Sequence, residues 1–547
     1  MSRFTLALLA LALGRASAQT WCGKNYEKGS PVVPPGGEFP TPPTSSSPLL
    51  AFRCAPALRP YLPEDALAPA GILVDTFLTH SEIADGAPID LADGAQAKLL
   101  VTVSIDGRVV TSGAVPLNAT KAELPFSLAS LEPRKAAYDV ACAATYTGAG
   151  GAQTFETSAA LAYLPDPTDG SAVTKMDLRT GALLARPANG KGGPYETVFP
   201  VGFYSGFGDY LATNLSVIDE MKEQGYTIIH PVPPYSNLTQ LMAVIKRMEE
   251  VGIYLMYDMR WTYQNDTSVA EQVNMVKSSP ALLLWYTADE PDGTSDPLNA
   301  TAHAYDLIYD LDGYHPVSLC LNCFDYYWSN YSAGADIVMQ DTYMVSNNVT
   351  WSVEWDTPCT PDYGCCGCDD CRGDFEDIST RMDLFAYRLW ANGWDRTKTI
   401  WTVPQGFGGA EYWPRTPTGP EFVLQSVLAI NHGGVGVVSW DAPTTTAIWD
   451  AAGLLGQASP ILKEYILSES ATFQHVFTDQ IDIGLWTVGS KTLVLATNLN
   501  YANETFDLAS VEGLRTGPVV QVLDSGATLT GSEIAFGSVG TGGWVLG

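Results

Sequence analysis

The chain has 547 residues, 46% of them hydrophobic and 16% charged, so it is long enough to bury more than one core. Its 60 acidic residues outnumber 29 Lys and Arg residues, which gives a formal net charge of -31. Such a charge repels nucleic acids and anionic membranes, and no basic cluster offsets it, so we expect neither of them as a partner.

The N-terminus has the layout of a secretory signal peptide. Arg3 precedes a mainly apolar run, Phe4–Leu13, and Ala16-Ser17-Ala18 follows as a cleavage site of small residues. We therefore predict that residues 1–18 are removed and that the mature, extracellular protein begins at Gln19. No later stretch reaches the roughly 18 uninterrupted apolar residues that a membrane helix needs.

Two further features agree with secretion. Eight asparagines stand in the pattern for N-glycosylation, namely Asn118, Asn214, Asn237, Asn265, Asn299, Asn330, Asn348 and Asn503. The ten cysteines are expected to form disulfides in an oxidising compartment. Five of them lie close together with no histidine nearby, so we favour a loop held by disulfides over a zinc site. These five are Cys359, Cys365, Cys366, Cys368 and Cys371.

The first third of the chain predicts β structure. Residues 19–48 are rich in Pro, Gly and Ser and are expected to form an extended lead-in. Over 49–165 short apolar runs alternate with turn residues, which predicts a β-sandwich domain. Residues 166–195 end in the stretch ANGKGGP and are interpreted as a linker.

The pattern changes near residue 196, where short apolar runs alternate with amphipathic segments such as Leu238–Val251 and Phe375–Ala391. Eight strands are predicted: Val198–Tyr204, Thr227–Pro231, Ile253–Asp258, Leu282–Thr287, Val317–Leu321, Ile337–Asp341, Ile400–Val403 and Gly436–Trp440. Eight such units match a (β/α)8 or TIM barrel, which we place at 196–465. Residues 466–547 return to short strands and predict a small C-terminal β domain. The predicted fold is thus α/β, with a central TIM barrel between an N-terminal β-sandwich and this domain.

Barrel enzymes carry their chemistry at the C-terminal ends of the strands. The fourth predicted strand delivers Asp289-Glu290-Pro291 to that end. A carboxyl group at the apolar rim of a barrel can have a raised pKa, as the acid in glycosidic cleavage requires. We therefore predict that Glu290 is a general acid; the alternative is that the tripeptide is only a surface turn.

The segment Trp285-Tyr286-x-x-Asp289-Glu290-Pro291 resembles the strand-four signature of the large clan of retaining barrel glycosidases, in which Asn-Glu-Pro carries the acid/base glutamate. It is more similar still to glycosidase-like barrels with Asp-Glu-Pro at this place. The resemblance covers roughly residues 196–460 and implies that Glu290 is the acid/base. In that clan a glutamate ending strand seven is the nucleophile, but Gln405 stands there in this chain. Gln405 is therefore assigned to substrate binding.

The second carboxylate has to come from another strand end. Asp341 follows strand six and is our first candidate, and Asp441, which follows strand eight, is the second. Asp258 after strand three and Glu411 after strand seven stay open. Each has a structural alternative, since Asp258 could pair with Arg260 and Asp441 could only cap a turn.

Aromatic and polar residues at the predicted strand ends suit a carbohydrate cleft, because aromatic faces stack on sugar rings. Each of these residues alone is more often part of the core than of a binding site. A single histidine such as His230 is also more often a core residue with its hydrogen bonds satisfied. The predicted substrate-binding residues are Tyr204, His230, Asp258, Arg260, Trp285, Tyr286, Asp289, Tyr343, Gln405 and Trp440.

Together these features predict a secreted, monomeric O-glycosyl hydrolase that acts on a polysaccharide or oligosaccharide through paired carboxylates. No nucleotide-binding, serine-hydrolase or zinc-protease motif is present, and nothing calls for a metal or another cofactor. The alternative is a carbohydrate-binding or cell-wall-associated protein on an inactivated barrel, which Gln405 supports. A disulfide-rich structural protein would explain the cysteines but not the carboxylates.

Overall fold

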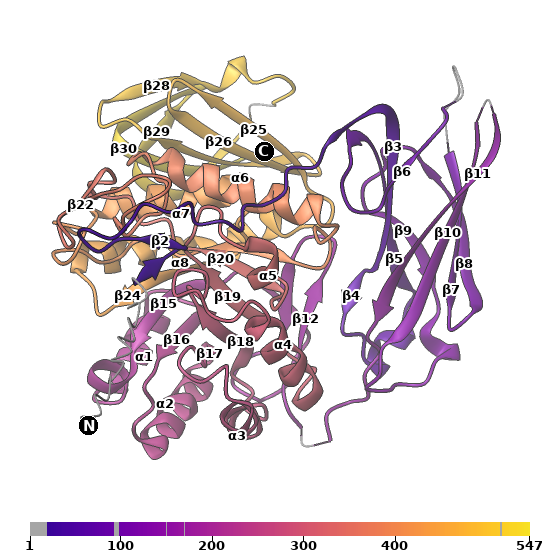
Figure 1. Ribbon diagram of the computed structural model, residues 1–547, viewed down its shortest axis with the longest axis horizontal. Helices are drawn as coiled ribbons and strands as arrows, with labels where there is room; N and C mark the ends of the chain where they lie inside the picture. Colours follow the sequence, from indigo (N-terminus) through magenta and orange to yellow (C-terminus); the bar gives the residue numbers. More distant parts are fainter. Residues whose placement is uncertain (1–18, 92–97, 149, 169, 515–516) are drawn as a thin grey trace, which may run out of the picture.

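The computed structural model describes residues 19–91, 98–148, 150–168, 170–514 and 517–547. The predicted signal peptide lies outside the described residues. Figure 1 shows three bodies: an N-terminal β domain beside a central barrel, and a C-terminal sheet over one side of that barrel. The predicted order of β domain, barrel and β domain is confirmed.

The N-terminal domain is a sandwich of two four-stranded antiparallel sheets. One sheet has the order β6-β3-β5-β9, with β3 Thr44–Pro56, β5 Ala70–Ser81, β6 Gly86–Pro88 and β9 Ala122–Phe126. The other has the order β11-β10-β7-β8, with β7 Lys98–Ile105, β8 Arg108–Pro116, β10 Tyr138–Gly148 and β11 Gly151–Leu161. Alternate residues of β10 are buried, as expected of a strand with one face in a core. The disulfide Cys54–Cys142 joins the two sheets.

The segment predicted as a linker contains two short strands, β12 Thr174–Asp177 and β13 Ala182–Ala185. They form a small sheet with β4, Leu58–Arg59, on one side and β14, Glu196–Val198, on the other. This sheet therefore links the sandwich to the start of the barrel through main-chain hydrogen bonds.

The barrel is closed by eight parallel strands in the order of the sequence. They are β15 Val201–Gly206, β16 Ile228–Val232, β17 Tyr254–Asp258, β18 Leu282–Asp289, β19 Val317–Leu321, β20 Ile337–Gln340, β23 Thr399–Thr402 and β24 Val437–Ala442. Each overlaps the strand predicted at its place. Their nearly continuous burial explains why they appear in the sequence as apolar runs.

In the described chain, seven helices connect the barrel strands and an eighth, α8, follows the last strand. They are α1 Ser216–Glu223, α2 Leu238–Val251, α3 Asp266–Val276, α4 Ala300–Leu311, α5 Trp328–Ser332, α6 Glu376–Ala391, α7 Gly419–Asn431 and α8 Thr446–Ile466. Helix α2 shows how local sequence sets their ends. The Asn237 side chain accepts hydrogen bonds from the backbone at its start, and Gly252 ends it in the left-handed conformation.

The C-terminal sheet packs against the barrel helices. Its strands are β25 Thr472–Thr478, β26 Ile481–Val488, β27 Lys491–Asn498, β28 Glu504–Asp507, β29 Val519–Thr530 and β30 Glu533–Leu546. A polar cluster links the two bodies: His432, just after α7, and His475 of β25 both contact the buried carboxylate of Asp482 in β26. Asn431 donates a hydrogen bond to the other carboxylate oxygen of Asp482.

Four disulfides are present in the described chain, so the prediction for the cysteines is confirmed for eight of the ten. Cys320 and Cys365 are not in a disulfide, which corrects the prediction for these two. The cysteine-rich loop, residues 351–371 between β20 and α6, holds two of them, Cys359–Cys366 and Cys368–Cys371. All eight predicted glycosylation asparagines are exposed. Within the residues that the structure describes, no helix combines the length and the apolar character needed to cross a membrane.

Candidate active site

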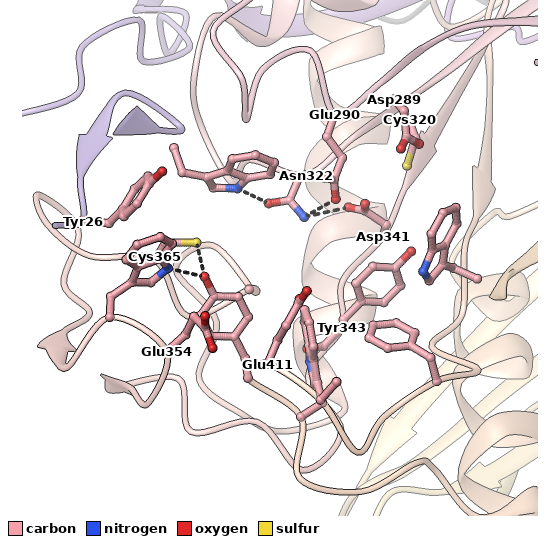
Figure 2. A pocket seen from close by; sticks show the side chains of 18 of the residues that line it. Tyr26, Asp289, Glu290, Cys320, Asn322, Asp341, Tyr343, Glu354, Cys365 and Glu411 are labelled. Carbon is pink, nitrogen blue, oxygen red and sulfur yellow. Dashed lines mark hydrogen bonds between the residues drawn. The ribbon is translucent and has the colours of Figure 1, made fainter. Parts of the chain in front are cut away.

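A cavity of about 540 Å³ opens at the C-terminal ends of the barrel strands (Figure 2). Residues from the barrel, the cysteine-rich loop and the N-terminal segment line it: Trp21, Tyr26, Tyr204, Asp289, Glu290, Cys320, Asn322, Asp341, Tyr343, Glu354, Trp355, Cys365, Gly367, Phe407, Ala410, Glu411, Tyr412, Trp413 and Trp440. Nine of these side chains are aromatic and five carry a carboxyl group. None of the described residues that line the cavity is a Lys, Arg or His.

Glu290 follows the last residue of β18 and points into this cavity. Its backbone is in the left-handed region, with φ of 49°, which non-glycine residues rarely adopt and which is often found at functional sites. The backbone N–H of Glu290 donates to the carbonyl of Cys320 at the end of β19, which fixes this conformation. Burial, and then the neighbouring carboxylate of Asp341, raise the pKa of Glu290 well above its ordinary value.

Asp341 lies beside Glu290 and comes from the end of β20. It is only 3% exposed, and this burial raises its pKa, while its hydrogen bonds to Glu290 and Asn322 act in the opposite direction. Two adjacent carboxyl groups in a buried site do not both ionise readily. We therefore describe the pair as holding one proton, with Glu290 as the group that carries it.

Asn322 bridges the two carboxyl groups. Its amide nitrogen donates to Oε1 of Glu290 at 2.9 Å and to Oδ1 of Asp341 at 3.2 Å (Figure 2). Because both oxygens contact one nitrogen, the distance between them cannot exceed the sum of these two distances. That sum is smaller than the separation of about 6.5–9.5 Å between the carboxyl groups of inverting glycosidases. It is compatible with the separation of about 5–5.5 Å in retaining enzymes.

Asn322 itself is held by its neighbours on three sides. The carboxylate of Asp292 accepts its backbone N–H at 3.2 Å and that of Cys323 at 2.8 Å, while Arg381 donates to its carbonyl at 2.6 Å. Trp21 donates its indole N–H to Oδ1 of Asn322 at 2.9 Å. This last contact fixes which end of the amide faces the carboxyl groups.

Trp21 belongs to the N-terminal strap, which we define as residues 19–26. The strap contains the short strands β1, Thr20–Trp21, and β2, Lys24–Asn25, and lies across the barrel mouth far from the sandwich (Figure 1). Gly293 leaves room for the Trp21 ring, since a Cβ at that position would lie 2.4 Å from it. The site is thus completed by residues about 300 positions away in the sequence.

The predicted substrate-binding residues fall into two groups. Tyr204, Asp289, Tyr343 and Trp440 line the cavity together with Glu290 and Asp341. The others, namely His230, Asp258, Arg260, Trp285, Tyr286 and Gln405, are buried behind that lining and are not part of it.

The buried group forms supports for the lining. Arg260 pairs with Asp258 at 2.7 Å and with Asp289 at 2.5 Å, and His230 contacts Asp258 at 2.7 Å while stacking on Tyr204. This arrangement matches the ion pair that was the structural alternative for Asp258.

The remaining predicted residues have other partners. Trp285 donates its indole N–H to Asp312, and Tyr286 donates to Asp289. Gln405 is fully buried and exchanges hydrogen bonds with the backbone of Val345, so it joins two loops of the barrel mouth.

The other candidates for the second carboxylate are placed less favourably than Asp341. Asp441 is half-buried at the end of β24, but it does not line the cavity. Glu411 does line the cavity, from an exposed position in the loop after β23. Of the candidates for the second carboxylate, Asp341 is the one whose side chain shares the Asn322 amide with Glu290.

Several lining residues were not singled out from the sequence. Asn322 directly follows the fifth strand, so the rule that points to Glu290 and Asp341 could have found it. Trp21, Tyr26, Glu354, Trp355 and Tyr412 come from loops whose position no local pattern predicts. Phe407 and Trp413, which also line the cavity, lie in the loop after the seventh strand.

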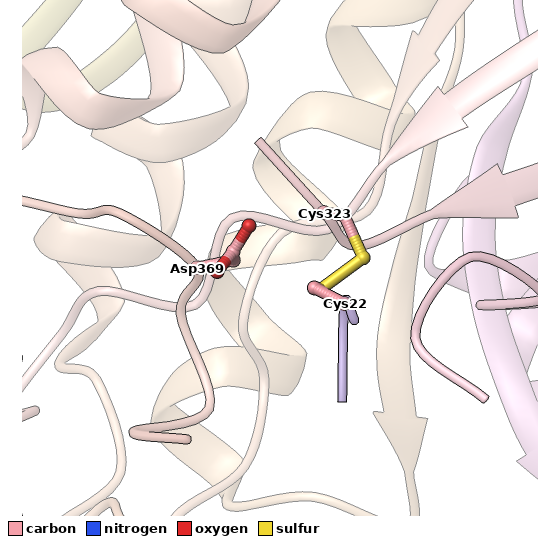
Figure 3. Close-up of side chains that lie close together, drawn as sticks. All are labelled: Cys22, Cys323 and Asp369. Atoms are coloured by element: carbon pink, nitrogen blue, oxygen red, sulfur yellow. A yellow bond between two sulfur atoms is a disulfide. The ribbon is translucent and has the colours of Figure 1, made fainter. Parts of the chain in front are cut away.

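Two groups in the described chain bring three metal-binding side chains together. In the first, Cys22 and Cys323 lie near Asp369, but their sulfurs are joined in a disulfide and are not free thiolates (Figure 3). The second is the cluster of His432, His475 and Asp482 under the C-terminal sheet, away from the cavity. Neither group includes Glu290 or Asp341.

No protein-family model and no curated protein matches the sequence. One similar solved structure is a β-glucuronidase from Ruminococcus gnavus, with 11% sequence identity and a TM-score of 0.32; the match covers 73% of this chain and 61% of that one. Another is a putative α-galactosidase from Bacteroides fragilis, with 10% identity and a TM-score of 0.42; the match covers 92% of this chain and 98% of that one. A third is an α-amylase from Geobacillus thermoleovorans, with 11% identity and a TM-score of 0.43; the match covers 63% of this chain and 98% of that one. The chain spans less than two thirds of the β-glucuronidase. At these values the similarity says nothing of the reaction, which has to be inferred from the site.

Proposed function

We propose that the chain is a secreted glycoside hydrolase in which Glu290 is the general acid and Asp341 is its partner. One observation supports this proposal above all others. Two carboxyl groups, bridged by one amide, lie in an aromatic cavity at the catalytic end of a TIM barrel.

The environment of each carboxyl group suits a different role. The raised pKa of Glu290 keeps its proton available for the glycosidic oxygen as the bond to the anomeric carbon breaks. Asp341, held by Asn322, stays beside the same carbon as a carboxylate and stabilises the positive charge that develops there.

We further propose that the reaction proceeds with retention. The carboxylate of Asp341 would form a bond to the anomeric carbon while Glu290 protonates the leaving oxygen. Water would then attack that carbon, Glu290 would accept its proton, and the bond to Asp341 would break. The short separation of the two groups supports this route, because it leaves no room for a water between Asp341 and the sugar.

The lining of the cavity favours a substrate without negative charge. It presents five carboxyl groups and no basic side chain, and the nearby Arg260 is already paired with two aspartates. A uronic acid would be repelled by these carboxylates. The aromatic faces of Trp440, Tyr343 and their neighbours suit the C–H faces of neutral sugars.

The test is release of sugar from neutral glucans, mannans, galactans and xylans and from an anionic polygalacturonate. The full-length secreted protein is compared with Glu290→Gln and Asp341→Asn, and Glu512→Gln on the exposed surface of the C-terminal domain is the matched control. We expect release from a neutral polymer, a loss of about a thousandfold in both site variants, and no change in the control.

Other outcomes would overturn the proposal. Equal release by the native protein and Glu290→Gln would remove Glu290 from the chemistry. Binding of a glycan with no release by any form would instead support the inactivated barrel.

A further inference from the structure

The N-terminal strap is fixed to the barrel mouth by covalent, ionic and main-chain contacts. The disulfide Cys22–Cys323 joins it to the loop after β19 (Figure 3). Lys24, only 3% exposed, pairs with Asp369 at 2.6 Å and with Asp370 at 2.7 Å in the cysteine-rich loop. Such a buried, doubly paired lysine holds the strap and the loop in one arrangement.

The strap, the cysteine-rich loop and Tyr412 from the loop after β23 together form an aromatic wall. The rings of Tyr26 and Trp355 lie 4.6 Å apart, and the Trp355 indole N–H donates to the Tyr412 hydroxyl at 2.7 Å. These three side chains line the same cavity as Glu290, and all three are half-buried, so part of each ring stays accessible. Their mutual contacts fix the rings in advance, which lowers the entropy cost of binding a ligand there.

This wall lies away from the carboxyl pair. In Figure 2 Tyr26, Glu354 and Cys365 are on one side of the cavity, while Asp341 and Tyr343 are on the other. A sugar that places its anomeric carbon between Glu290 and Asp341 is surrounded by Tyr204, Tyr343 and Trp440. The aromatic surface of the strap and the loop is left free for the next part of the ligand.

We infer that the N-terminal strap and the cysteine-rich loop form a second sugar-binding subsite, so that the substrate is a neutral oligosaccharide or polysaccharide rather than a single sugar on a small aglycone. Accessible aromatic faces beside hydrogen-bonding hydroxyl and carboxylate groups recognise a pyranose unit. This inference rests on the proposed function, because it takes the carboxyl pair as the point of cleavage.

Trp21 stands between the two subsites. Its ring lines the cavity on the strap side, and its N–H fixes the amide of Asn322 that bridges the carboxyl pair. The strap thus contributes both a wall of the second subsite and a positioning contact of the first.

The test is calorimetric binding of neutral gluco-, manno-, galacto- and xylo-oligosaccharides of one to four units to the full-length Glu290→Gln protein. Tyr26→Ala and Trp355→Ala are then added separately to that background. The matched control is Trp351→Ala, because Trp351 is an exposed tryptophan of the same loop that does not line the cavity. Thermal unfolding confirms that each variant is folded.

We expect affinity to rise from one unit to two. Tyr26→Ala and Trp355→Ala should each weaken binding of the longer ligands about tenfold, a typical value for one lost aromatic contact, and should leave single-unit binding unchanged. Equal affinities for all lengths, or the same effect in Trp351→Ala, would overturn the inference while the proposed function still stood. Failure of the native protein to bind or cleave any glycan would overturn both.

Discussion

Asn322→Ala removes the bridge between the two carboxyl groups and leaves each group itself in place. The variant loses the hydrogen bonds to Glu290 and Asp341 and leaves the indole N–H of Trp21 without its acceptor. A hydrogen bond to a carboxylate contributes about 1.5–3 kcal/mol. Both bonds exist in the free enzyme, so the rate depends on the bond to Glu290, which strengthens as this group gives up its proton. Taking about 2 kcal/mol for that gain, the loss is about thirtyfold in kcat/KM.

The assay is steady-state hydrolysis of the best polymer substrate, together with its pH profile. Because Asn322 stabilises the ionised partner of the pair, we expect its loss to move the acid limb of the profile to higher pH. Asn392→Ala is the matched control, since this half-buried asparagine bonds Ser329 and does not line the cavity. Activity of Asn322→Ala within threefold of the native protein, with an unchanged pH profile, would refute the positioning role.

Three further predictions concern pH and stability. Activity should follow a bell-shaped pH profile, falling at low pH as Asp341 gains a proton and at high pH as Glu290 loses one. Since burial raises the pKa of Glu290, the alkaline limb should lie well above the pKa range of an ordinary glutamate. An alkaline limb within that range would contradict the assignment. Cys22→Ser opens the bond to Cys323 and should lower the free energy of unfolding by about 3 kcal/mol in denaturant titrations, together with kcat/KM; unchanged unfolding would show that the disulfide does not hold the strap. Asp482→Asn leaves two histidines without their shared buried carboxylate and should destabilise the protein by about 3 kcal/mol in the same titration, whereas an exposed aspartate of that domain should tolerate the change.

The barrel could be predicted because its strands and helices have local signals. Parallel strands buried on both faces give short apolar runs, and helix α2 begins and ends at residues with clear capping roles. Predicting the position of Glu290 and Asp341 needed only one more step, since both stand at C-terminal strand ends. Asn322 follows the same rule.

The outer half of the site could not be predicted in this way. Trp21 and Tyr26 reach the cavity because a disulfide and a buried lysine hold the strap there, and the pairing of ten cysteines cannot be read from their spacing. Predicted binding residues such as Trp285 and Gln405 failed to reach the cavity for the opposite reason. A strand-end position does not say which side chain points inward and which supports the lining from behind.

The most direct test of the central claim compares two leaving groups on the same sugar. The dinitrophenolate group of a dinitrophenyl glycoside leaves without being protonated. The leaving oxygen of a natural glycan needs the proton of Glu290. On a set of dinitrophenyl glycosides of neutral sugars, Glu290→Gln should release dinitrophenol in a rapid first turnover while losing activity on the polymer. Asp341→Asn should lose both activities. Equal losses of Glu290→Gln on both substrates, or full activity of Asp341→Asn on either, would contradict the assignment of acid and partner.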